Sequence, residues 1–472
     1  MKMLLGDRWV DRDQRIDVIH PFDNSMVDAV PRASVDDVRT AITAAQRGAV
    51  AMRKLTGYQR FEILDRVADL MRDHAEDLAR TITLEEGKIL AEGRIEVDRA
   101  TEIIVLSAEE AKRLGGEVVP LDGAPGVSGK LGFTMRVPCG VVVAISPFNF
   151  PLHLVCHKIG PALAAGNACI LKPATDTPLS ALKIVELFQQ AGTPPEALQC
   201  LTGPGGALGE ALCSDNSVRK ITFTGSRDVG ERITRVAGLK RVTMELGSNS
   251  PLIVMSDADP EIVARTAVGT SFANAGQACI STQRIIAHRE VYADLINALR
   301  TATEPLKLGN PLEQGTDVGP MIREADSARV ADWVTEATDA GARIVIGGQR
   351  DGALHAPTVV ADVDPKMRIS CDEVFGPVVA VTETADLDHA IALANDTNYG
   401  LSAAIFTRDI DTAMKFVREC EAGNLHVNWG TQWRADMMPY GGLKESGFGK
   451  EGPHYAVQEM TELKMTVFHT QG

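Results

Sequence analysis

Three polar side chains that lie far apart in the sequence have the chemistry of one reactive centre: a thiol, an amide and a carboxylate. Cys279 ends the small-residue segment Gly276-Gln-Ala-Cys, where a substrate could approach its sulfur. Asn149 lies in Ser146-Pro-Phe-Asn-Phe-Pro, a loop whose prolines would aim an amide. Glu245 ends an apolar run. Each residue alone also fits an ordinary role, as a structural cysteine, a turn asparagine or a surface glutamate, so a shared site depends on the elements that position them.

Those elements alternate between short apolar runs, which predict buried strands, and helical segments such as Leu179 to Gln190. The runs are Val141 to Ile145, Ala168 to Leu171, Ile221 to Phe223, Arg241 to Met244 and Leu252 to Val254. Parallel strands need helical crossovers and bind ligands at their carboxyl ends, so this pattern predicts an open doubly wound sheet. A second alternating block, from Pro260 to about Gly423, predicts a second α/β domain.

The segments outside these two alternating blocks have different residue patterns. Ser34, with Asp37 three residues later, predicts a capped helix to about Arg53, and the rest of the first hundred residues are expected to be mainly helical. From Leu131 to Val137 the residues alternate with period two, which predicts an antiparallel strand outside the main sheet. The predicted fold class is therefore α/β, with two doubly wound domains and a small antiparallel element.

Composition excludes several kinds of protein. The chain has 472 residues and a net charge of −15, which disfavours binding to nucleic acid phosphates or anionic membranes. No apolar stretch is long enough for a membrane helix, and the apolar run among the first residues is too short for a signal peptide. The 8 cysteines are scattered, without CxxC or zinc spacing, as is typical of reduced thiols. We expect a cytoplasmic, enzyme-sized protein without nucleic acid or membrane partners.

Eight segments carry a resemblance to a known family over essentially the whole length. In chain order they are Ser146-Pro-Phe-Asn-Phe-Pro-Leu, Gly160-Pro-Ala-Leu-Ala-Ala-Gly-Asn, Leu171-Lys-Pro, Phe223-Thr-Gly-Ser, Glu245-Leu-Gly, Gly276-Gln-Ala-Cys, Glu373-Val-Phe-Gly-Pro-Val and Pro439-Tyr-Gly-Gly-Leu-Lys-Glu-Ser-Gly. Together they resemble the aldehyde dehydrogenase superfamily. One such motif would be weak, but eight in family order make coincidence negligible.

The resemblance implies a catalytic set. Cys279 would be the nucleophile, and the oxyanion formed by its attack on an aldehyde would be bound by the Asn149 amide and the backbone N–H of Cys279. Hydride transfer to a nicotinamide ring would leave a thioester. Glu245 would activate the water that hydrolyses it, and because relatives that pass the acyl group to coenzyme A usually lack this carboxylate, the expected product is a free acid.

The resemblance also implies a site for NAD or NADP. Lys172 and Glu373 would contact the adenosine and nicotinamide ribose hydroxyls, Phe375 would pack at the nicotinamide side, and Ser226 would open a helix whose N–H groups favour pyrophosphate. The remaining residues of this predicted set are Pro147, Phe148, Gly205, Gly225 and Leu246. The glycine-rich turn from Thr202 to Gly209 is not a clean GxGxxG and is weak by itself.

One departure from the family bears on the cofactor. Where NAD-preferring relatives often carry a glutamate three residues after the lysine, this chain has Thr175. A carboxylate there would repel a 2′-phosphate, whereas a hydroxyl beside a lysine can accept one, so we expect NADP to be used, alone or beside NAD. Asp176 works against this expectation, because it could restore the missing negative charge.

Within the superfamily the chain most resembles the branch of lactaldehyde and non-phosphorylating glyceraldehyde-3-phosphate dehydrogenases. Arg99 matches an arginine that holds the substrate's anionic group there, and Arg434 is a second candidate. Three substrate-side positions differ from a triose-phosphate clamp: Phe150, Ala278 and Trp433. We therefore expect a smaller polar or anionic aldehyde, such as lactaldehyde, a semialdehyde, or a phosphonate- or sulfonate-bearing one. Two surface arginines are the plain alternative.

Lys158 and Glu451 are expected either to relay protons or to form a structural ion pair. His153 and His157 are four residues apart, but the segment lacks the glutamate of a hydrolytic zinc helix, so we predict no metal site.

The expected domains follow. Residues 1–118 and 139–245 would bind the dinucleotide, 246–445 would form the catalytic domain, and 119–138 with 455–472 would be oligomerisation strands. The strands' exposed edges, which pair between subunits in this family, predict a homodimer or homotetramer. Two other functions stay open: a non-catalytic binding or structural protein, and a cysteine esterase with Glu245 as base, which would need no dinucleotide.

Overall fold

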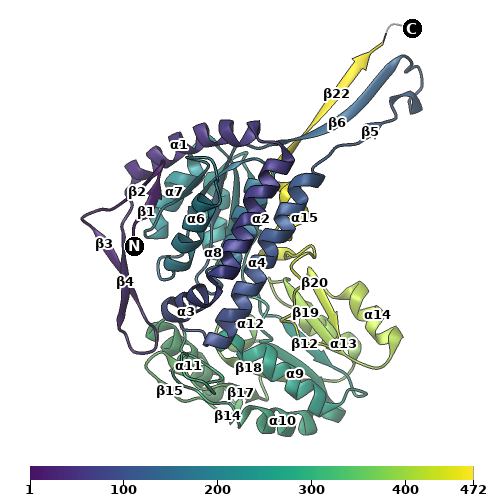
Figure 1. Cartoon of the computed structure of the whole chain (residues 1–472). Helices are drawn as coiled ribbons and strands as arrows, with labels where there is room; N and C mark the ends of the chain where they lie inside the picture. Colours follow the sequence, from purple (N-terminus) through teal and green to yellow (C-terminus); the bar gives the residue numbers. More distant parts are fainter. Residues whose placement is uncertain (471–472) are drawn as a thin grey trace.

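The computed structural model describes residues 1–470, which are built around two large sheets (Figure 1). The first has eight strands in the order β2-β1-β9-β8-β7-β10-β11-β21. Strands β7 to β11 are parallel, and β1, β2 and β21 are antiparallel additions at the edges. The strands are β1 (Met3–Leu5), β2 (Arg8–Val10), β7 (Val141–Ile145), β8 (Ala168–Lys172), β9 (Leu198–Cys200), β10 (Val218–Thr224), β11 (Arg241–Glu245) and β21 (Gly447–Phe448).

Helices cover both faces of this sheet, and side chains of β7 show how. Val142 and Ala144 point into one core, with α2 to α6, while Val141 and Val143 point into the opposite core, with α1, α7 and α8. Burial on both faces explains why these strands are uninterrupted apolar runs. The helices are α1 (Val35–Lys54), α2 (Gly57–Asp73), α3 (Ala75–Glu86), α4 (Leu90–Arg113), α5 (His153–Ala164), α6 (Leu179–Gln190), α7 (Gly205–Ser214) and α8 (Arg227–Ala237).

The second sheet has seven strands in the order β14-β17-β18-β13-β12-β19-β20, parallel except for β14. They are β12 (Pro251–Val254), β13 (Arg284–His288), β14 (Arg343–Ile346), β17 (Thr358–Ala361), β18 (Val378–Thr384), β19 (Ser402–Phe406) and β20 (Asn424–Val427). The helices of this half, which are packed in two further cores, are α9 (Pro260–Phe272), α10 (Arg289–Thr303), α11 (Glu324–Asp339), α12 (Arg368–Cys371), α13 (Leu387–Asn395) and α14 (Ile410–Glu419). This half ranges from teal to yellow-green in Figure 1.

A three-stranded antiparallel sheet projects from the body of the molecule (Figure 1). It consists of β5 (Val118–Val119), β6 (Lys130–Pro138) and β22 (Thr461–His469), with the short helix η1 (Leu121–Gly123) between the first two. The predicted tail strand begins at Thr461 rather than at residue 455, because α15 (Pro453–Glu459) is a helix packed against α4 and α5. Residues 471 and 472 of the predicted tail lie outside the described residues.

The predicted fold class is confirmed: two doubly wound α/β sheets and a separate antiparallel element. The Ser34 side chain accepts from the backbone N–H of Asp37, whose carboxylate accepts in return, as predicted. The expectation of mainly helix before residue 100 missed β1, β2, and the hairpin of β3 (Arg15–Ile19) and β4 (Met26–Pro31), whose short strands have little periodicity. The domain limits stay a prediction.

Three short elements complete the chain: the hairpin of β15 (Arg350–Asp351) and β16 (Leu354–His355), and the helices η2 (Ala273–Gly276) and η3 (Lys444–Ser446). Within residues 1–470, no helix combines the length and the apolar character that crossing a membrane would require.

Candidate active site

The predicted site residues of the first half collect where the strand order changes direction. From β7 the chain adds β8 and β9 on one side and β10 and β11 on the other, so the carboxyl ends of β7 and β10 flank the crevice that such sheets use for ligands. Asn149 follows β7, Lys172 ends β8, Ser226 follows β10, and Glu245 ends β11. Four predicted site residues therefore share one edge of the sheet.

The Asn149 loop is joined to the Cys279 loop by hydrogen bonds. Asn149 Nδ2 donates to the carbonyl oxygen of Gln277 (2.8 Å), two residues before Cys279. The carbonyl oxygen of Asn149 accepts from Lys88 Nζ (2.8 Å) and from Asn274 Nδ2 (3.0 Å). Because the two loops come from different halves of the chain, these bonds fix the amide of one half relative to the thiol of the other.

The turn before Cys279 is held in an unfavourable backbone conformation. Asn274 and Ala275 have φ of 53° and 51°, in a left-handed region that asparagine tolerates but alanine rarely adopts. Gly276 follows with φ of 69°, and a Cβ there would collide with the carbonyl of Gly376, so only glycine fits. Strained backbone of this kind is concentrated at functional sites.

The sulfur of Cys279 lies 3.2 Å from the hydroxyl of Tyr440. The residue as a whole is half-buried, but protein atoms surround the sulfur and burial raises the pKa of the Cys279 thiol to about 12. The hydrogen bond with Tyr440 lowers this pKa, whereas the carboxylates of Glu373 and Glu245 raise it. The cysteine is therefore within electrostatic reach of both predicted carboxylates.

Glu245 is a buried carboxyl group without a donor. It is 2% exposed, and neither of its oxygens has a hydrogen-bond partner among the described residues. Burial, and after it the neighbouring charge of Glu451, raises the pKa of Glu245 well above its usual value. Gly441 makes room for it, since a Cβ there would lie 2.8 Å from Glu245 Oε1. Burying a carboxylate without hydrogen-bond donors costs free energy, which marks Glu245 for chemistry rather than for stability.

Behind Glu245 lies a network of buried ion pairs around Glu451. Lys158 Nζ donates to Glu451 Oε1 (2.9 Å) and to Thr224 Oγ1 (2.6 Å), and Arg434 donates to Glu451 Oε2 (3.2 Å). Burial raises the pKa of Glu451, but the charges of Lys158 and Arg434 bring it well below its usual range, so the group is ionised. Lys158 and Glu451 thus form the ion pair that the sequence allowed.

Around Lys172 the geometry fits a ligand rich in hydroxyl and phosphate oxygens. Its ammonium group is buried and, among protein acceptors, donates to the carbonyl oxygen of Pro173 (2.7 Å), without a carboxylate partner; burial lowers the pKa of Lys172 to about 8. The hydroxyl of Thr175 donates to the carbonyl of Gly203 (3.2 Å). Asp176 does not stand alone, because Arg323 binds its carboxylate with two guanidinium nitrogens.

The other predicted cofactor residues lie in loops or at helix starts. Phe148 and Phe375 meet edge to face, 5.8 Å apart, and Phe375 has a left-handed φ of 48°. The carboxylate of Glu373 accepts from the backbone N–H of Ser248 (2.9 Å), and its pKa is raised to about 7 by burial. Ser226 and Gly205 begin α8 and α7, helices whose first N–H groups have no side-chain cap. The others are Pro147 beside Phe148, Gly225 between β10 and α8, and Leu246 directly after Glu245.

The comparisons with known proteins agree with this geometry. The model of the "Aldehyde dehydrogenase family" matches residues 9–466. The chain belongs to this family. A 3-sulfolactaldehyde dehydrogenase of Priestia aryabhattai is 46% identical over 467 residues, which cover 99% of this chain and 98% of that one. Membership confirms the predicted enzyme class, an NAD(P)-dependent aldehyde dehydrogenase, and does not favour a binding protein without turnover.

Two solved structures extend the comparison. Aldehyde dehydrogenase 21 from Physcomitrella patens, in complex with the reaction product succinate, superposes with a TM-score of 0.96 at 37% identity, covering 99% of this chain and 98% of that one. The NADP-dependent glyceraldehyde-3-phosphate dehydrogenase from Bacillus halodurans C-125, complexed with NADP, gives 0.97 at 35% identity, covering 100% and 99%. The predicted branch of the family is confirmed as well.

Two of the predicted substrate-side residues, Arg99 and Arg434, belong to a cluster around Asp436. The Asp436 carboxylate accepts from Arg99 (2.6 Å) and from His153 Nε2 (3.0 Å), while Arg434 donates to His157 Nδ1 (3.1 Å). Arg434 is nearly inaccessible, with 5% of its side chain exposed, whereas Arg99 keeps 32%. Of the two predicted arginines, only Arg99 therefore offers accessible charge.

The same cluster has the composition of a metal site. One ligand atom each from His153, His157 and Asp436 lies within 4.8 Å of the others. Burial lowers the pKa of the two histidines to about 3 and about 4, so both are neutral. However, the arginines that hold Asp436 and His157 would repel a cation, so the cluster is better described as a hydrogen-bonded support.

Two further predicted residues lie close to this cluster or to the nucleophile. The ammonium nitrogen of Lys88 lies 3.9 Å from the ring centroid of Phe150. The same ring meets the ring of His153 edge to face. Ala278 is buried directly before Cys279.

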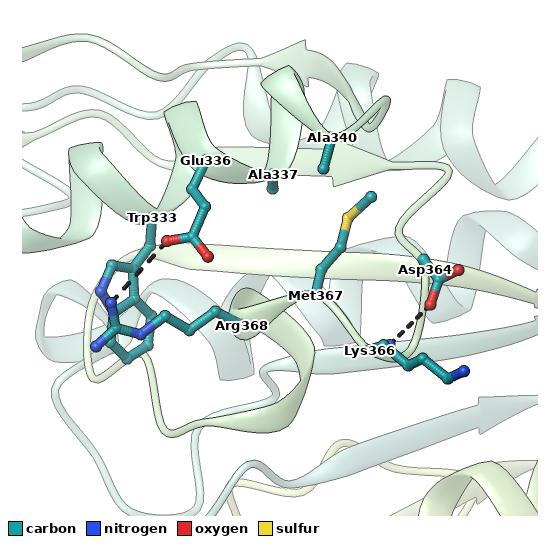
Figure 2. Close-up of a pocket in the computed structure, with 8 residues that line it drawn as sticks. All are labelled: Trp333, Glu336, Ala337, Ala340, Asp364, Lys366, Met367 and Arg368. Atoms are coloured by element: carbon teal, nitrogen blue, oxygen red, sulfur yellow. Dashed lines mark hydrogen bonds and ion pairs between the residues drawn. The ribbon is translucent and has the colours of Figure 1, made fainter.

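A separate hollow of this dehydrogenase lies between α11 and α12 (Figure 2). Arg368 covers the ring of Trp333 at 4.3 Å and pairs with Glu336. None of the predicted site residues lines this hollow. Besides the pair of Arg368 and Glu336, the Asp364 carboxylate accepts from the backbone N–H of Lys366 (2.8 Å).

Sequence reasoning missed three residues of the site. Tyr440 lay inside a quoted family segment but was given no role, although its motif position was a usable signal. Asp436 ends the segment Arg434-Ala-Asp, which carries part of the resemblance to this branch, but it was given no role because its partner Arg99 is 337 residues away. Arg323 carried no local signal, because its partner Asp176 lies in the other half of the chain.

Proposed function

We propose that this enzyme oxidises a small anionic aldehyde to the free carboxylic acid, with Cys279 as nucleophile and NADP or NAD as hydride acceptor. The observation that carries the proposal is the buried carboxyl group of Glu245, which has no donor within residues 1–470 and lies within electrostatic reach of the cysteine. Such a group is suited to hold and deprotonate a water molecule. Hydrolysis of a thioester is the step of this reaction class that requires that water.

Each step of the proposed reaction is assigned to particular residues of the chain. The Cys279 thiolate attacks the aldehyde carbon, and the carbonyl electrons move to the oxygen, which the Asn149 amide and the backbone N–H of Cys279 bind. One Nδ2 hydrogen of Asn149 is used by the carbonyl of Gln277, which leaves the other for the oxyanion. When bound, the nicotinamide ring accepts the hydride released as the thioester forms. Glu245 takes a proton from water, whose oxygen attacks the thioester, and the acid and the free thiol are released.

The substrate we propose is a three- or four-carbon aldehyde with a sulfonate or carboxylate at the far end. Arg99 supports this, because its guanidinium is half-buried, oriented by Asp436 and still accessible. Arg434 is bound by Glu451 and His157, so its charge acts without direct contact. The names of the similar proteins point the same way: one acts on 3-sulfolactaldehyde and another binds succinate as product.

For the cofactor we propose NADP as the better acceptor. Lys172 and Thr175 would face the adenosine ribose, and the charge of Asp176, which would repel a 2′-phosphate, is compensated by Arg323. Ser226 and Gly205, at uncapped helix starts, would bind the pyrophosphate. Phe375, Phe148, Pro147, Gly225 and Leu246 would complete the walls.

The oligomer we propose is a homodimer or homotetramer. The projecting sheet exposes apolar side chains of β6 and β22, among them Leu131, Leu463 and Phe468, at 51%, 55% and 54%. A second copy would cover them and their unpaired strand edges. The eight free thiols suit a reducing compartment, so we place the enzyme in the cytoplasm.

A panel of aldehydes tests this function. Reduction of NADP and NAD would be followed spectrophotometrically with lactaldehyde, succinate semialdehyde, 3-sulfolactaldehyde and neutral aldehydes of equal length. We expect the anionic aldehydes to give the highest kcat/KM. In Cys279→Ala, oxidation and ester cleavage should both be lost while NADP still quenches the protein's fluorescence. Oxidation that survives in this variant would remove Cys279 as nucleophile, and ester cleavage without any oxidation by the wild type would favour the esterase.

A further inference from the structure

We infer that Tyr440 is a further catalytic residue, whose hydroxyl donates a hydrogen bond to the sulfur of Cys279 and stabilises it as the thiolate. The inference rests on the proposed role of Cys279 as nucleophile. The contact that carries it is the 3.2 Å separation between Cys279 Sγ and Tyr440 Oη. This hydroxyl is the one side-chain hydrogen-bond partner of the sulfur within residues 1–470.

The surroundings of the sulfur otherwise oppose ionisation. Burial and the two carboxylates of Glu373 and Glu245 disfavour a negative charge there, and no lysine or histidine is hydrogen-bonded to the sulfur within residues 1–470. A reactive cysteine needs a donor or a cation to hold its thiolate. Tyr440 supplies the donor and Arg434, behind it, the cation.

The direction of the hydrogen bond follows from the burial of the phenol. Tyr440 is 3% exposed, and burial, with the cysteine's charge, raises the pKa of its hydroxyl well above 10. The hydroxyl therefore keeps its proton when Cys279 loses its own, and an O–H facing a thiolate can only donate. Hydrogen bonds to ionised groups are about twice as strong as neutral ones.

The backbone and ring of Tyr440 are fixed, so the hydroxyl is aimed rather than free. Its backbone forms a two-way bridge with Glu451, with N···O distances of 3.2 and 2.7 Å. The guanidinium of Arg434 lies 3.9 Å from the centroid of its ring, and is itself bound by Glu451 and His157. The ion-pair network behind Glu245 thus also orients the donor to the nucleophile.

The consequence for reactivity is specific. Removing the hydroxyl should raise the pH at which Cys279 ionises, by roughly one to two units for a hydrogen bond to a charged group. A less acidic thiol gives a more nucleophilic thiolate once formed, so the loss should shrink as the pH rises. A residue that merely fills space would lower activity equally at every pH.

The test is the pH dependence of alkylation of Cys279 by iodoacetamide in the full-length enzyme. Mass spectrometry would measure the modified Cys279 peptide, with the exposed Cys371 as internal reference. In Tyr440→Phe, the midpoint of the rate profile for Cys279 should move up by roughly one to two pH units, a ten- to hundredfold slower reaction at neutral pH. The profile of Cys371 should not move. Tyr292→Phe, which removes a hydroxyl bonded to Asp362 at 2.9 Å, is the matched control and should leave the Cys279 midpoint in place.

An unchanged midpoint in a folded Tyr440→Phe would overturn the inference. Should that variant fail to fold, 3-fluorotyrosine at position 440 decides, because it keeps the shape and donates more strongly: a lower midpoint supports the role and an unchanged one rejects it. The proposed function is tested separately by Cys279→Ala. If Cys279→Ala is inactive and the midpoint in Tyr440→Phe does not move, Cys279 remains the nucleophile and only the role of Tyr440 is rejected.

Discussion

Two groups of buried carboxylates, equally hidden from water, have opposite surroundings. On α3 and α4, Glu85 and Glu96 are 0% and 2% exposed, and at the end of β11 Glu245 is 2% exposed. Glu96 accepts from the backbone N–H groups of Leu152 (2.9 Å) and His153 (3.1 Å) and from Lys88 (2.6 Å). Glu85 accepts from the first N–H groups of α6. Glu245 accepts no hydrogen bond from any residue that the structure describes.

The difference separates support from chemistry. Glu85 and Glu96 bind the beginnings of α6 and α5, where uncapped N–H groups and the helix dipole favour a negative charge. Lys88, held by Glu96, in turn donates to the carbonyl of Asn149. The paired carboxylates thus hold in place the amide that Glu245's site requires. Substitution of Glu85 or Glu96 should lower the free energy of unfolding, whereas substitution of Glu245 should lower kcat.

The largest effect is expected for Glu96→Ala. It leaves Lys88 as a buried cation without its carboxylate and frees two N–H groups of α5, which should lower the free energy of unfolding by about 3–5 kcal/mol. Urea unfolding followed by circular dichroism measures the loss. The matched control is Glu76→Ala, which breaks an exposed pair with Arg94 and should cost less than about 1 kcal/mol. Equal losses in the two variants would mean that Glu96 does not support the site.

Asn149→Ala should reduce kcat by roughly 10²- to 10³-fold, since removing one oxyanion donor typically raises the barrier by about 3–4 kcal/mol. Steady-state reduction of NADP with the best aldehyde of the panel measures it, and the Kd for NADP should stay near that of the wild type. A kcat within a few-fold of the wild type would contradict the assignment of the oxyanion to this amide.

How far the sequence alone predicted this site depends on the range of each signal. Asn149, Glu245 and Cys279 were found because each ends a strand or turn within a motif, and the strands were found because burial on both faces makes them continuous apolar runs. The support was not predictable in this way. Glu96 lies inside a helix, without a strand end or turn to mark it, and its bonds to Leu152 and His153 span 56 and 57 residues. Such pairings appear only when the chain is folded.

For Glu245→Gln, steady-state turnover should fall about a hundredfold while the first turnover still yields a burst of reduced cofactor. Burial, and after it the charge of Glu451, raises the pKa of Glu245 above its usual range, so kcat should rise with pH as the base forms. The glutamine variant should lose that rise. Its unfolding free energy should not decrease, because the amide replaces a carboxyl whose ionised form the buried site disfavours. Stopped-flow absorbance measures the burst. If the burst and the pH dependence of kcat are the same in Glu245→Gln as in the wild type, Glu245 has no role in hydrolysis.

The smallest effect is expected from a third kind of carboxylate, one paired at the surface. Asp176 and Arg323 have side chains 29% and 56% exposed, and exposed pairs contribute about 0.2–1 kcal/mol, so the affinity change should not exceed about fivefold. Arg323→Gln uncovers the carboxylate and should weaken NADP binding while leaving NAD binding unchanged, because only NADP carries the 2′-phosphate. Asp176→Asn should do the reverse and strengthen NADP. Titration of protein fluorescence at low and high salt measures both Kd values, and the difference should shrink in salt. If the two variants shift NADP in the same direction, this pair acts on the fold of the loop and not on the charge that the cofactor meets.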